Sequence, residues 1–426
     1  MEHRAPEAVQ RCDRARFPAC EEAKEPGVEG DAAGDEGSTD PAQHRRGHGL
    51  RRTGTYGAEV PAQTLSSIVV DAVGAPIRID LSGLSATDRD AVVGAWDAAT
   101  LTIVDGVDAT VSPVRGGEDD EMLSGLSSAV TQAAIAARSG TLWMLHAAGL
   151  AAPDGGVVAL VGRSGAGKTT AARALARSWG YVSDETIGVE CDGRVHAYRK
   201  PLSIISGDRP FKQQHSPVTL GLRPLPSAPL RLRRVIVLDR RTRPTPARLV
   251  PLDLPDALVA LAPHSSALAA LPRPLHTVAT LLTRSGGVLR AEYHDAEDLV
   301  LLVRGLMTQQ PGGAPGPTTG EDDALPTVPA PARVDTAAIR YRRVAVVDSL
   351  AFSDGRVAVL TAEHDGRGTL RILSAAASVV WRAAADSTRD EVFDAATLGR
   401  PDAEATRSID GLLAQLVEAG LLTVTV

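Results

Sequence analysis

The sequence has few cysteines, no long apolar run and no excess of positive charge. Its three cysteines, Cys12, Cys20 and Cys191, are too few for a disulfide framework, which favours a reducing, cytoplasmic compartment. No apolar stretch is long enough to span a bilayer, and the arginine pairs near residues 45 and 51 are not followed by the apolar core of a signal peptide. The net charge of -7 argues against non-specific binding to nucleic acid or to an anionic membrane.

Lysine is also rare, and one lysine stands in the most informative segment. The chain has only four lysines, Lys24, Lys168, Lys200 and Lys212. In the segment VVALVGRSGAGKTTAARALA, an apolar run ends at Gly162 in a glycine-rich loop, and Lys168 then opens a helical pattern. This order of strand, glycine-rich loop, lysine and helix is typical of a phosphate-binding loop.

Each part of this loop has a separate physical task. Glycines let successive backbone amides point inward around a phosphate chain, Lys168 can reach the terminal phosphates, and the Thr169 hydroxyl can hold magnesium. The helix that follows presents its positive N-terminal end to the anion. An ordinary glycine-rich turn would leave Lys168 unexplained. The predicted phosphate-binding residues are Gly162, Ser164, Gly165, Ala166, Gly167, Lys168, Thr169 and Thr170.

Composition and periodicity divide the chain into four parts. The fold class that they predict is an α/β domain with a small β-rich module in front of the phosphate loop, followed by a separate α+β unit. The predicted parts are a disordered N-terminal extension (1–56), the α/β domain (60–307), a Pro/Gly-rich linker (308–335) and a C-terminal unit (338–426). Strands are expected at 67–73, 77–81, 101–107 and 235–238, and helices at 86–98, 121–138, 252–261, 275–282 and 295–307.

His146 is expected to lie beside the phosphate loop. Residues 141–152 and 156–161 have strand patterns and flank Asp154-Gly155, a preferred two-residue hairpin turn. A register centred on that turn places His146 opposite Arg163. The alternative is a histidine that is satisfied inside the sheet.

The acidic pair Asp184-Glu185 follows one helix later. Trp179-Gly180 is predicted to end the loop helix, and a strand at 181–183 then delivers the two acids. A strand that returns beside the loop strand after one helix ends at the edge of the sheet that holds the phosphates. A carboxylate there can bind magnesium or accept the proton of an attacking hydroxyl, whereas the alternative is a pair of acids in a surface turn.

Two later segments are less specific. The basic pair Arg199-Lys200 is either a solvated edge or a clamp for phosphate and an acidic substrate. Residues 207–229, which are rich in proline, are predicted to form a long surface loop of the kind that acts as a lid or binds substrate.

The C-terminal unit is predicted to be winged-helix-like. Strands at 344–350, 356–361 and 369–373 precede helices at 375–385, 389–396 and 403–419, and Gly420 caps the last helix. The expected core includes Trp381, Leu412, Leu413 and Leu416. The unit contains no cluster of catalytic side chains, so a binding role follows by elimination.

His146, the loop up to Thr170 and the pair Asp184-Glu185 together resemble the HPr serine kinase family and its relatives. This resemblance implies ATP as the phosphoryl donor, Mg²⁺ as the metal and a seryl hydroxyl as the acceptor. It further implies His146 and Asp184 as catalytic residues, and Lys168 and Thr169 as nucleotide and metal contacts, with Glu185 as a second Mg²⁺ contact. Glu185 stands where HPr kinases carry a second aspartate, so the reverse, phosphorylase activity is not implied.

The C-terminal unit resembles PqqD-type domains, which recognise leader peptides of ribosomally made, post-translationally modified peptides (RiPPs). The matching segments are VVD at 346–348, ILS at 372–374, Val380-Trp381 and LVEAGLL at 416–422. The resemblance implies that a leader peptide adds as a strand to the third strand and packs on the last helix.

Together the resemblances imply an ATP-dependent kinase of RiPP biosynthesis that binds a precursor leader peptide and phosphorylates a Ser/Thr hydroxyl. The alternative is a non-catalytic, ATP-binding adaptor that presents the precursor to other modifying enzymes. A kinase of central carbon regulation is a third hypothesis, which the peptide-binding unit disfavours. Expected partners are the leader peptide and other modifying enzymes, without nucleic acid or membrane, and the sequence leaves an oligomer open.

Overall fold

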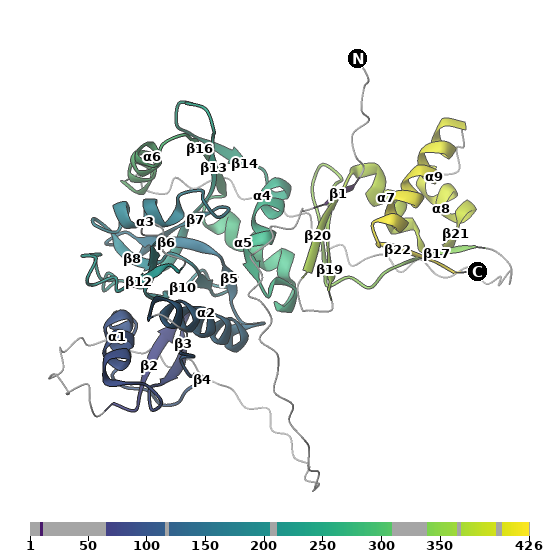
Figure 1. Ribbon diagram of the computed structural model, residues 1–426. Helices are drawn as coiled ribbons and strands as arrows, with labels where there is room; N and C mark the ends of the chain where they lie inside the picture. Colours follow the sequence, from purple (N-terminus) through teal and green to yellow (C-terminus); the bar gives the residue numbers. More distant parts are fainter. Residues whose placement is uncertain are drawn as a thin grey trace, which may run out of the picture.

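The computed structural model describes residues 9–11, 65–115, 119–204, 211–308, 339–363, 368–397 and 403–425. Over that part of the chain it is a mixed α/β protein with nine α-helices and several separate sheets (Figure 1). None of the helices described is both long and apolar enough to cross a bilayer. The expected extension (1–56) and linker (308–335) lie outside the described residues, apart from 9–11 and Thr308.

A small module precedes the phosphate loop, as expected. Two antiparallel strands, β2 (Ser67–Ala72) and β3 (Ala75–Asp80), are joined by β4 (Ala109–Val111), which runs parallel to β3. Helices α1 (Ala86–Trp96) and α2 (Asp119–Arg138) supply apolar side chains to the same core. The expected strand at 101–107 is wrong, because the chain leaves β2 after a single bridge at Thr100 and the side chain of Ile103 is 83% exposed.

A six-stranded sheet organises the main domain. Its strand order is β14-β16-β13-β7-β6-β8, and β13 runs parallel to both β7 and β16. β6 is antiparallel to both of its neighbours, so β7 and β8 run in the same direction and end at the same edge of the sheet. The bounds are β6 (Ala147–Ala151), β7 (Gly156–Val161), β8 (Gly180–Ser183), β13 (Arg231–Arg240), β14 (Arg248–Leu252) and β16 (Val288–Tyr293).

Both faces of this sheet are covered by helices. The apolar run of β7 is buried throughout, and its side chains alternate between two cores because strand residues point to opposite faces in turn. Val158 and Leu160 face the core of α3 (Lys168–Leu175) and α6 (Ala296–Thr308). Val157, Ala159 and Val161 face the core of α4 (Leu254–Leu261) and α5 (Pro274–Arg284).

The hairpin before the phosphate loop differs from the expected register by one residue. Ala147 pairs with Val161, and the Ala152 N–H donates to the Gly156 carbonyl. The turn therefore has three residues instead of two, and its last residue, Gly155, has a φ of 88°. This geometry is that of a three-residue hairpin, in which glycine takes the left-handed position.

The strand pattern of residues 141–152 is split at His146. The part before it, β5 (Trp143–Leu145), belongs to a second sheet with the order β10-β9-β5-β15, and the part after it is β6. The other members of the second sheet are β9 (Ile187–Val189), β10 (Val195–His196) and β15 (Ser265–Ser266). His146 thus lies where the chain passes from one sheet to the other.

Other expectations are corrected in the same domain. Helix α3 ends at Leu175, four residues before Trp179, and turns follow it. β8 does not lie beside β7, because β6 separates them. Strand β16 was not expected at all. The predicted loop at 207–229 is described from residue 211 onward, and this part is not all loop, because β12 (Gln213–His215) pairs with β11 (Leu202–Ile204).

The C-terminal unit combines two small sheets with three helices. β18 (Asp348–Ala351), β19 (Val357–Ala362) and β20 (Gly368–Leu373) form one antiparallel sheet. The other consists of β17 (Arg340–Arg343), β21 (Ala385–Thr388) and β22 (Leu422–Thr425), and the helices are α7 (Ala375–Ala383), α8 (Arg389–Thr397) and α9 (Ala403–Glu418). The expected strand at 344–350 begins only at Asp348, because residues 344–347 cross from one sheet to the other. Gly420, at a φ of 67°, caps α9 as expected.

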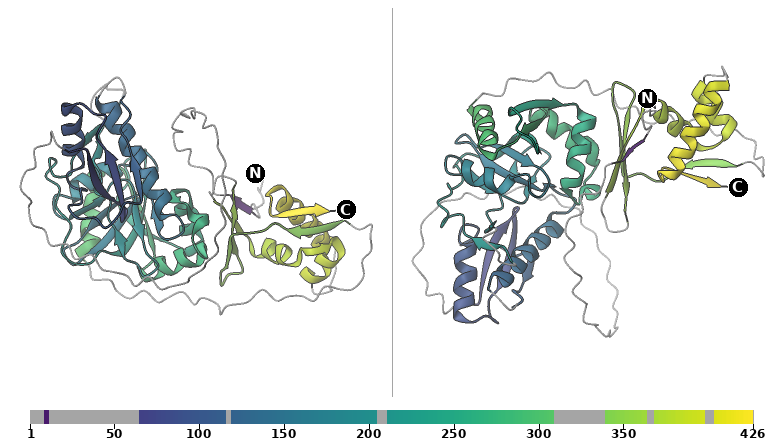
Figure 2. Two further views of the ribbon diagram at one scale, coloured as in Figure 1. Left: turned by 90° about the horizontal axis from the view of Figure 1, so that it is seen from below. Right: turned by 45° about the horizontal axis from the view of Figure 1, so that its top comes forward.

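The sheet β18-β19-β20 is buried on both faces. Leu360, Leu370 and Ile372 belong to the same core as α4 and α5, whereas Val359 and Leu373 pack in the core of α7 and α9. Both views in Figure 2 show this sheet between the main domain and the C-terminal helices. The two units therefore share a continuous apolar core.

A buried carboxylate joins the two units at the edge of this core. Asp348 Oδ2 accepts hydrogen bonds from the Leu275 N–H (2.8 Å) and the His276 N–H (3.4 Å), and its two oxygens lie 3.1 Å from His276 Nδ1. The residue at the N-terminal cap of α5, Arg273, makes no capping hydrogen bond of its own. Asp348 therefore caps α5 from the neighbouring unit.

Asp348→Ala is expected to lower the free energy of unfolding by about 1–3 kcal/mol, because buried amides at the start of α5 lose their acceptor. Urea unfolding measures the change. The control is Asp394→Ala, which removes an exposed carboxylate from α8. Equal stability of the two variants would contradict a structural role for the Asp348 cap.

The N-terminal extension contributes a strand, which corrects the expectation of disorder at residues 9–11. β1 (Val9–Arg11) pairs antiparallel with β20, at Leu373, Ile372 and Arg371. This pairing places the start of the chain on the edge of the C-terminal sheet that β19 does not use (Figure 1).

Candidate functional site

The phosphate loop connects β7 to α3. Gly165 and Gly167 have φ angles of 81° and 93°, which residues other than glycine rarely adopt. Gly167 is the N-cap of α3 and makes no side-chain capping bond, so no capping side chain covers the first turn of the helix. Tyr293 is the last residue of β16, and its hydroxyl donates a hydrogen bond to the Ala166 carbonyl, which attaches the loop to the sheet. Burial raises the pKa of Tyr293 to about 12.

Lys168 is buried and folded onto the loop. Its ammonium donates to the Gly162 carbonyl and lies 3.4 Å from the Arg163 carbonyl. Burial lowers the pKa of Lys168, and the negative charges of Asp184 and Glu185 oppose that shift. The charges of Asp184 and Glu185 therefore attract the Lys168 ammonium. This agrees with the topology, in which β7 and β8 end at the same edge of the sheet.

Asp184 and Glu185 have different partners. Asp184 is buried, and the Tyr181 hydroxyl donates to its Oδ1 at 2.9 Å. Glu185 Oε2 lies 2.9 Å from the ammonium of Lys200. Lys200 is only 1% exposed and also donates to Ser127 Oγ on α2 at 3.1 Å. Lys200 is therefore not a solvated edge, and the structure gives it the role of a buried counter-ion.

The environment separates the pKa values of the two acids. Burial raises the pKa of Asp184, and Lys200 offsets only part of that shift. Burial would also raise the pKa of Glu185, but attraction and a hydrogen bond from Lys200 outweigh it, so the pKa lies below the ordinary value. Such a separation is a common way to divide proton transfer and charge stabilisation between two carboxylates.

A second histidine accompanies His146. The His146 N–H donates to the His264 carbonyl at 2.7 Å, and the two rings are stacked with centroids 6.4 Å apart. His264 ends the short 3-10 helix η2 (Ala262–His264) and is 9% exposed, and its Nδ1 is buried without a hydrogen-bond partner. Because a buried N–H without an acceptor is costly, we place the proton of the neutral ring on Nε2.

The pKa values of both histidines are lowered to about 4, mainly by burial and then by the positive charge of Lys168. Both rings are therefore neutral at pH 7. The charge of Lys168 lowers the pKa of both rings, so His146 lies near the loop. It does not reach the loop through the expected pairing with Arg163.

The pKa shifts predict a stability change in acid. Because the unfolded chain binds protons at histidine near pH 6.5 and the folded chain only near pH 4, stability is expected to rise with pH between these values. Titration of the histidine Hε1 resonances by NMR is expected to give midpoints near 4 for His146 and His264. Midpoints near 6.5 would contradict the neutral, buried pair.

The structure brings the predicted residues Lys168, Asp184, Glu185 and His146 into one neighbourhood, with Thr169 half-buried beside them at the start of α3. Ser164 and Thr170 are exposed on the loop and the first turn. Sequence reasoning missed Tyr181, His264 and Tyr293. It singled out Lys200, but as a solvated edge or a clamp for phosphate and not as the buried partner of Glu185.

The side chains that this site offers to a metal are one hydroxyl and two carboxylates, those of Thr169, Asp184 and Glu185. Among the described residues, no group of three or more His, Cys, Asp or Glu side chains could hold a metal ion. A hydroxyl and two carboxylates are instead the small protein donor set that suits Mg²⁺ bound together with phosphates.

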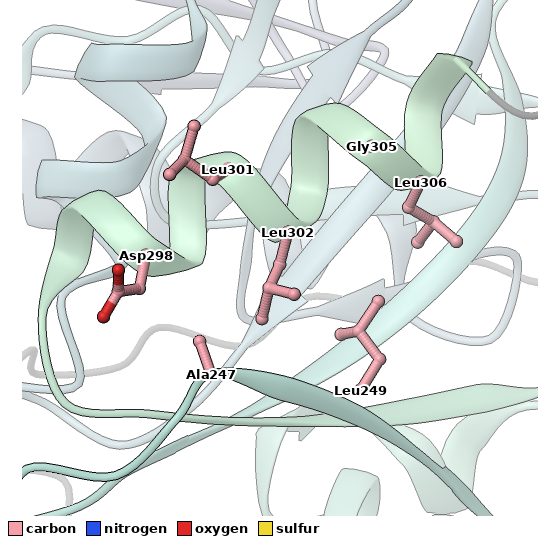
Figure 3. A pocket seen from close by; sticks show the side chains of 7 residues that line it. All are labelled: Ala247, Leu249, Asp298, Leu301, Leu302, Gly305 and Leu306. Atoms are coloured by element: carbon pink, nitrogen blue, oxygen red, sulfur yellow. The ribbon is translucent and has the colours of Figure 1, made fainter.

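A separate hollow lies between α6 and β14. It has a volume of about 550 Å³ and is lined mainly by Leu249, Leu301, Leu302 and Leu306 (Figure 3). None of the residues that line it belongs to the phosphate loop, the acidic pair or the histidine pair. It is therefore not part of the candidate site.

No protein-family model matches the chain, and no curated protein matches it.

Proposed function

We propose that the chain is an ATP-dependent kinase of RiPP biosynthesis, with an HPr kinase-like P-loop domain and a PqqD-like winged-helix unit. The observation that carries this proposal is the meeting of Lys168, the two acids and the two histidines at one edge of the main sheet. A nucleotide site alone needs only the loop and its lysine. The acids and histidines add groups that can act on an acceptor hydroxyl.

The loop residues bind the phosphates of ATP in this proposal. The backbone amides of residues 164–169 and the N-terminal end of α3 surround the anion, and Lys168 exchanges the carbonyls of Gly162 and Arg163 for phosphate oxygens. Thr169 and Glu185 would hold Mg²⁺, which supplies charge neutralisation for the transferred phosphoryl group. Tyr293 keeps the loop in place through Ala166.

Asp184 accepts the proton of the attacking hydroxyl. Burial raises its pKa toward the range in which a carboxylate is a useful base, and Tyr181 orients it. The Ser/Thr oxygen then forms a bond to the γ-phosphorus as the bond from that phosphorus to ADP breaks. The neutral rings of His146 and His264 donate hydrogen bonds at this site without adding charge.

The C-terminal unit binds the leader peptide. β20 offers an edge for strand addition, in which backbone hydrogen bonds give affinity and side-chain pockets give specificity. Because this sheet shares a core with α4 and α5, the bound peptide is held next to the catalytic domain and its core segment is at high local concentration.

A non-catalytic adaptor that presents the peptide to other modifying enzymes is the second candidate. The observation in its favour is the ion pair in which Lys200 engages one oxygen of Glu185, since a carboxylate so engaged is a weaker ligand for Mg²⁺.

Labelled ATP distinguishes the two functions. The protein is incubated with γ-labelled ATP, Mg²⁺ and a precursor peptide encoded beside it. Transfer of label to a Ser or Thr of the peptide is expected, and Asp184→Asn is expected to lose transfer while it still binds nucleotide. Peptide binding without transfer of label would exclude the kinase and favour the adaptor.

A further inference from the structure

The outer edge of β20 is only partly covered. β20 pairs with β19 along all six of its residues, from Gly368 to Leu373. On the other edge, β1 pairs only with Arg371, Ile372 and Leu373. Within the described part of the chain, the first half of this edge, residues 368–370, pairs with no strand on that side.

A peptide can reach β20 only through this edge. One face of the strand packs Leu370 and Ile372 against the core of α4 and α5, and the other packs Leu373 against α7 and α9. Thr369 and Arg371, on the same side as Leu373, are half-buried, and the backbone groups along the outer edge are the surface left for an additional strand. Sheet edges of this kind pair readily with an extended segment.

We propose that Val9–Arg11 is an internal competitor that occupies the peptide-binding edge of β20 until an extended peptide displaces it. The inference rests on the proposed function, because the displacing peptide is the leader of the precursor. The competition itself does not depend on phosphoryl transfer.

The short pairing suits such a competitor. Three residues form few backbone hydrogen bonds, so covalent attachment to the same chain supplies much of the occupancy. An incoming peptide can first pair with residues 368–370 and then replace β1 residue by residue. A longer strand than β1 gains hydrogen bonds along the whole of β20.

The test uses the full-length chain and a peptide taken from its own sequence. A fluorescent peptide with residues 5–15, in which Cys12→Ser prevents oxidation, is titrated with the protein and followed by anisotropy. Gln10→Pro/Arg11→Pro weakens β1 in the protein, because the amides of consecutive strand residues point to opposite sides and one of the two prolines must remove a bond to β20. The matched control is Ala32→Pro/Ala33→Pro, which places two prolines elsewhere in the extension.

The double-proline variant is expected to bind the peptide at least about 10-fold more tightly than the wild-type protein and the control. Hydrogen exchange should show reduced protection of those amides of residues 371–373 that point toward β1 in this variant, with protection restored by the peptide. Equal affinity of all three proteins, or protection gained outside β20, would overturn the inference. Competition that persists while label transfer fails would defeat the kinase and leave the competitor standing.

Discussion

Lys168→Ala is expected to reduce phosphoryl transfer by about 100- to 1000-fold, the size of effect seen when one preorganised charge donor is removed from a transition state. Lys168 is the cation at the phosphate loop whose ammonium now rests on the carbonyls of Gly162 and Arg163. Alanine leaves the loop without a partner for the terminal phosphates. Initial rates of label transfer, together with nucleotide binding measured by calorimetry, report the change.

The matched control is Arg173→Ala, which removes an exposed cation from the same helix. It is expected to keep wild-type rates. Wild-type transfer by Lys168→Ala would remove the phosphate loop from the mechanism. Loss of transfer in both variants would indicate damage to α3 instead of the loss of a specific charge.

Lys200→Met is expected to lower the free energy of unfolding by about 3–5 kcal/mol, the cost typical of removing one partner of a buried ion pair. Lys200 is almost fully buried, and its ammonium lies 2.9 Å from Glu185 Oε2. Methionine keeps most of the length of the side chain but removes the ammonium that pairs with Glu185. Urea unfolding at pH 7 gives the difference, with Arg304→Met, on α6, as the exposed control.

The pH dependence gives a further check on Lys200. The pKa of Glu185 is lowered in the folded protein, so the pair stabilises the fold above the ordinary glutamate pKa and the stabilisation is lost as pH falls through the folded value. The difference between wild type and Lys200→Met should therefore shrink in acid. A difference that does not change with pH would assign the loss to packing, not to charge.

The sequence was most informative where one residue type has a single physical task. Gly165, Gly167 and Lys168 predicted a phosphate-binding loop, and the structure gives both glycines a positive φ and folds Lys168 onto the loop. Asp184-Glu185 was correctly expected at the edge of the sheet where β7 ends, although β6 separates β8 from β7. Because β6 is antiparallel to both strands, β7 and β8 run in the same direction.

Residues that contribute through tertiary contacts were not predictable in this way. His264 ends one turn of 3-10 helix and precedes a strand of only two residues, so no period marks it. It reaches His146 because β15 pairs with β5, and Ser265 lies opposite Leu145, which is 120 positions earlier in the sequence. The hairpin register failed for a local reason: Asp154-Gly155 is equally compatible with a three-residue turn, and Pro153 lies within that turn.

The expected linker divides the sequence into two units, but one apolar core extends across both of them. The sheet β18-β19-β20 packs against α4 and α5 in this core. Asp348, in β18, accepts a hydrogen bond from the Leu275 N–H at the start of α5. A truncation or gene fusion that cuts at residues 309–338 would therefore bring a large apolar surface of each fragment into water. Heat should melt the intact chain as one cooperative unit, in which the C-terminal unit cannot loosen without disturbing the main domain.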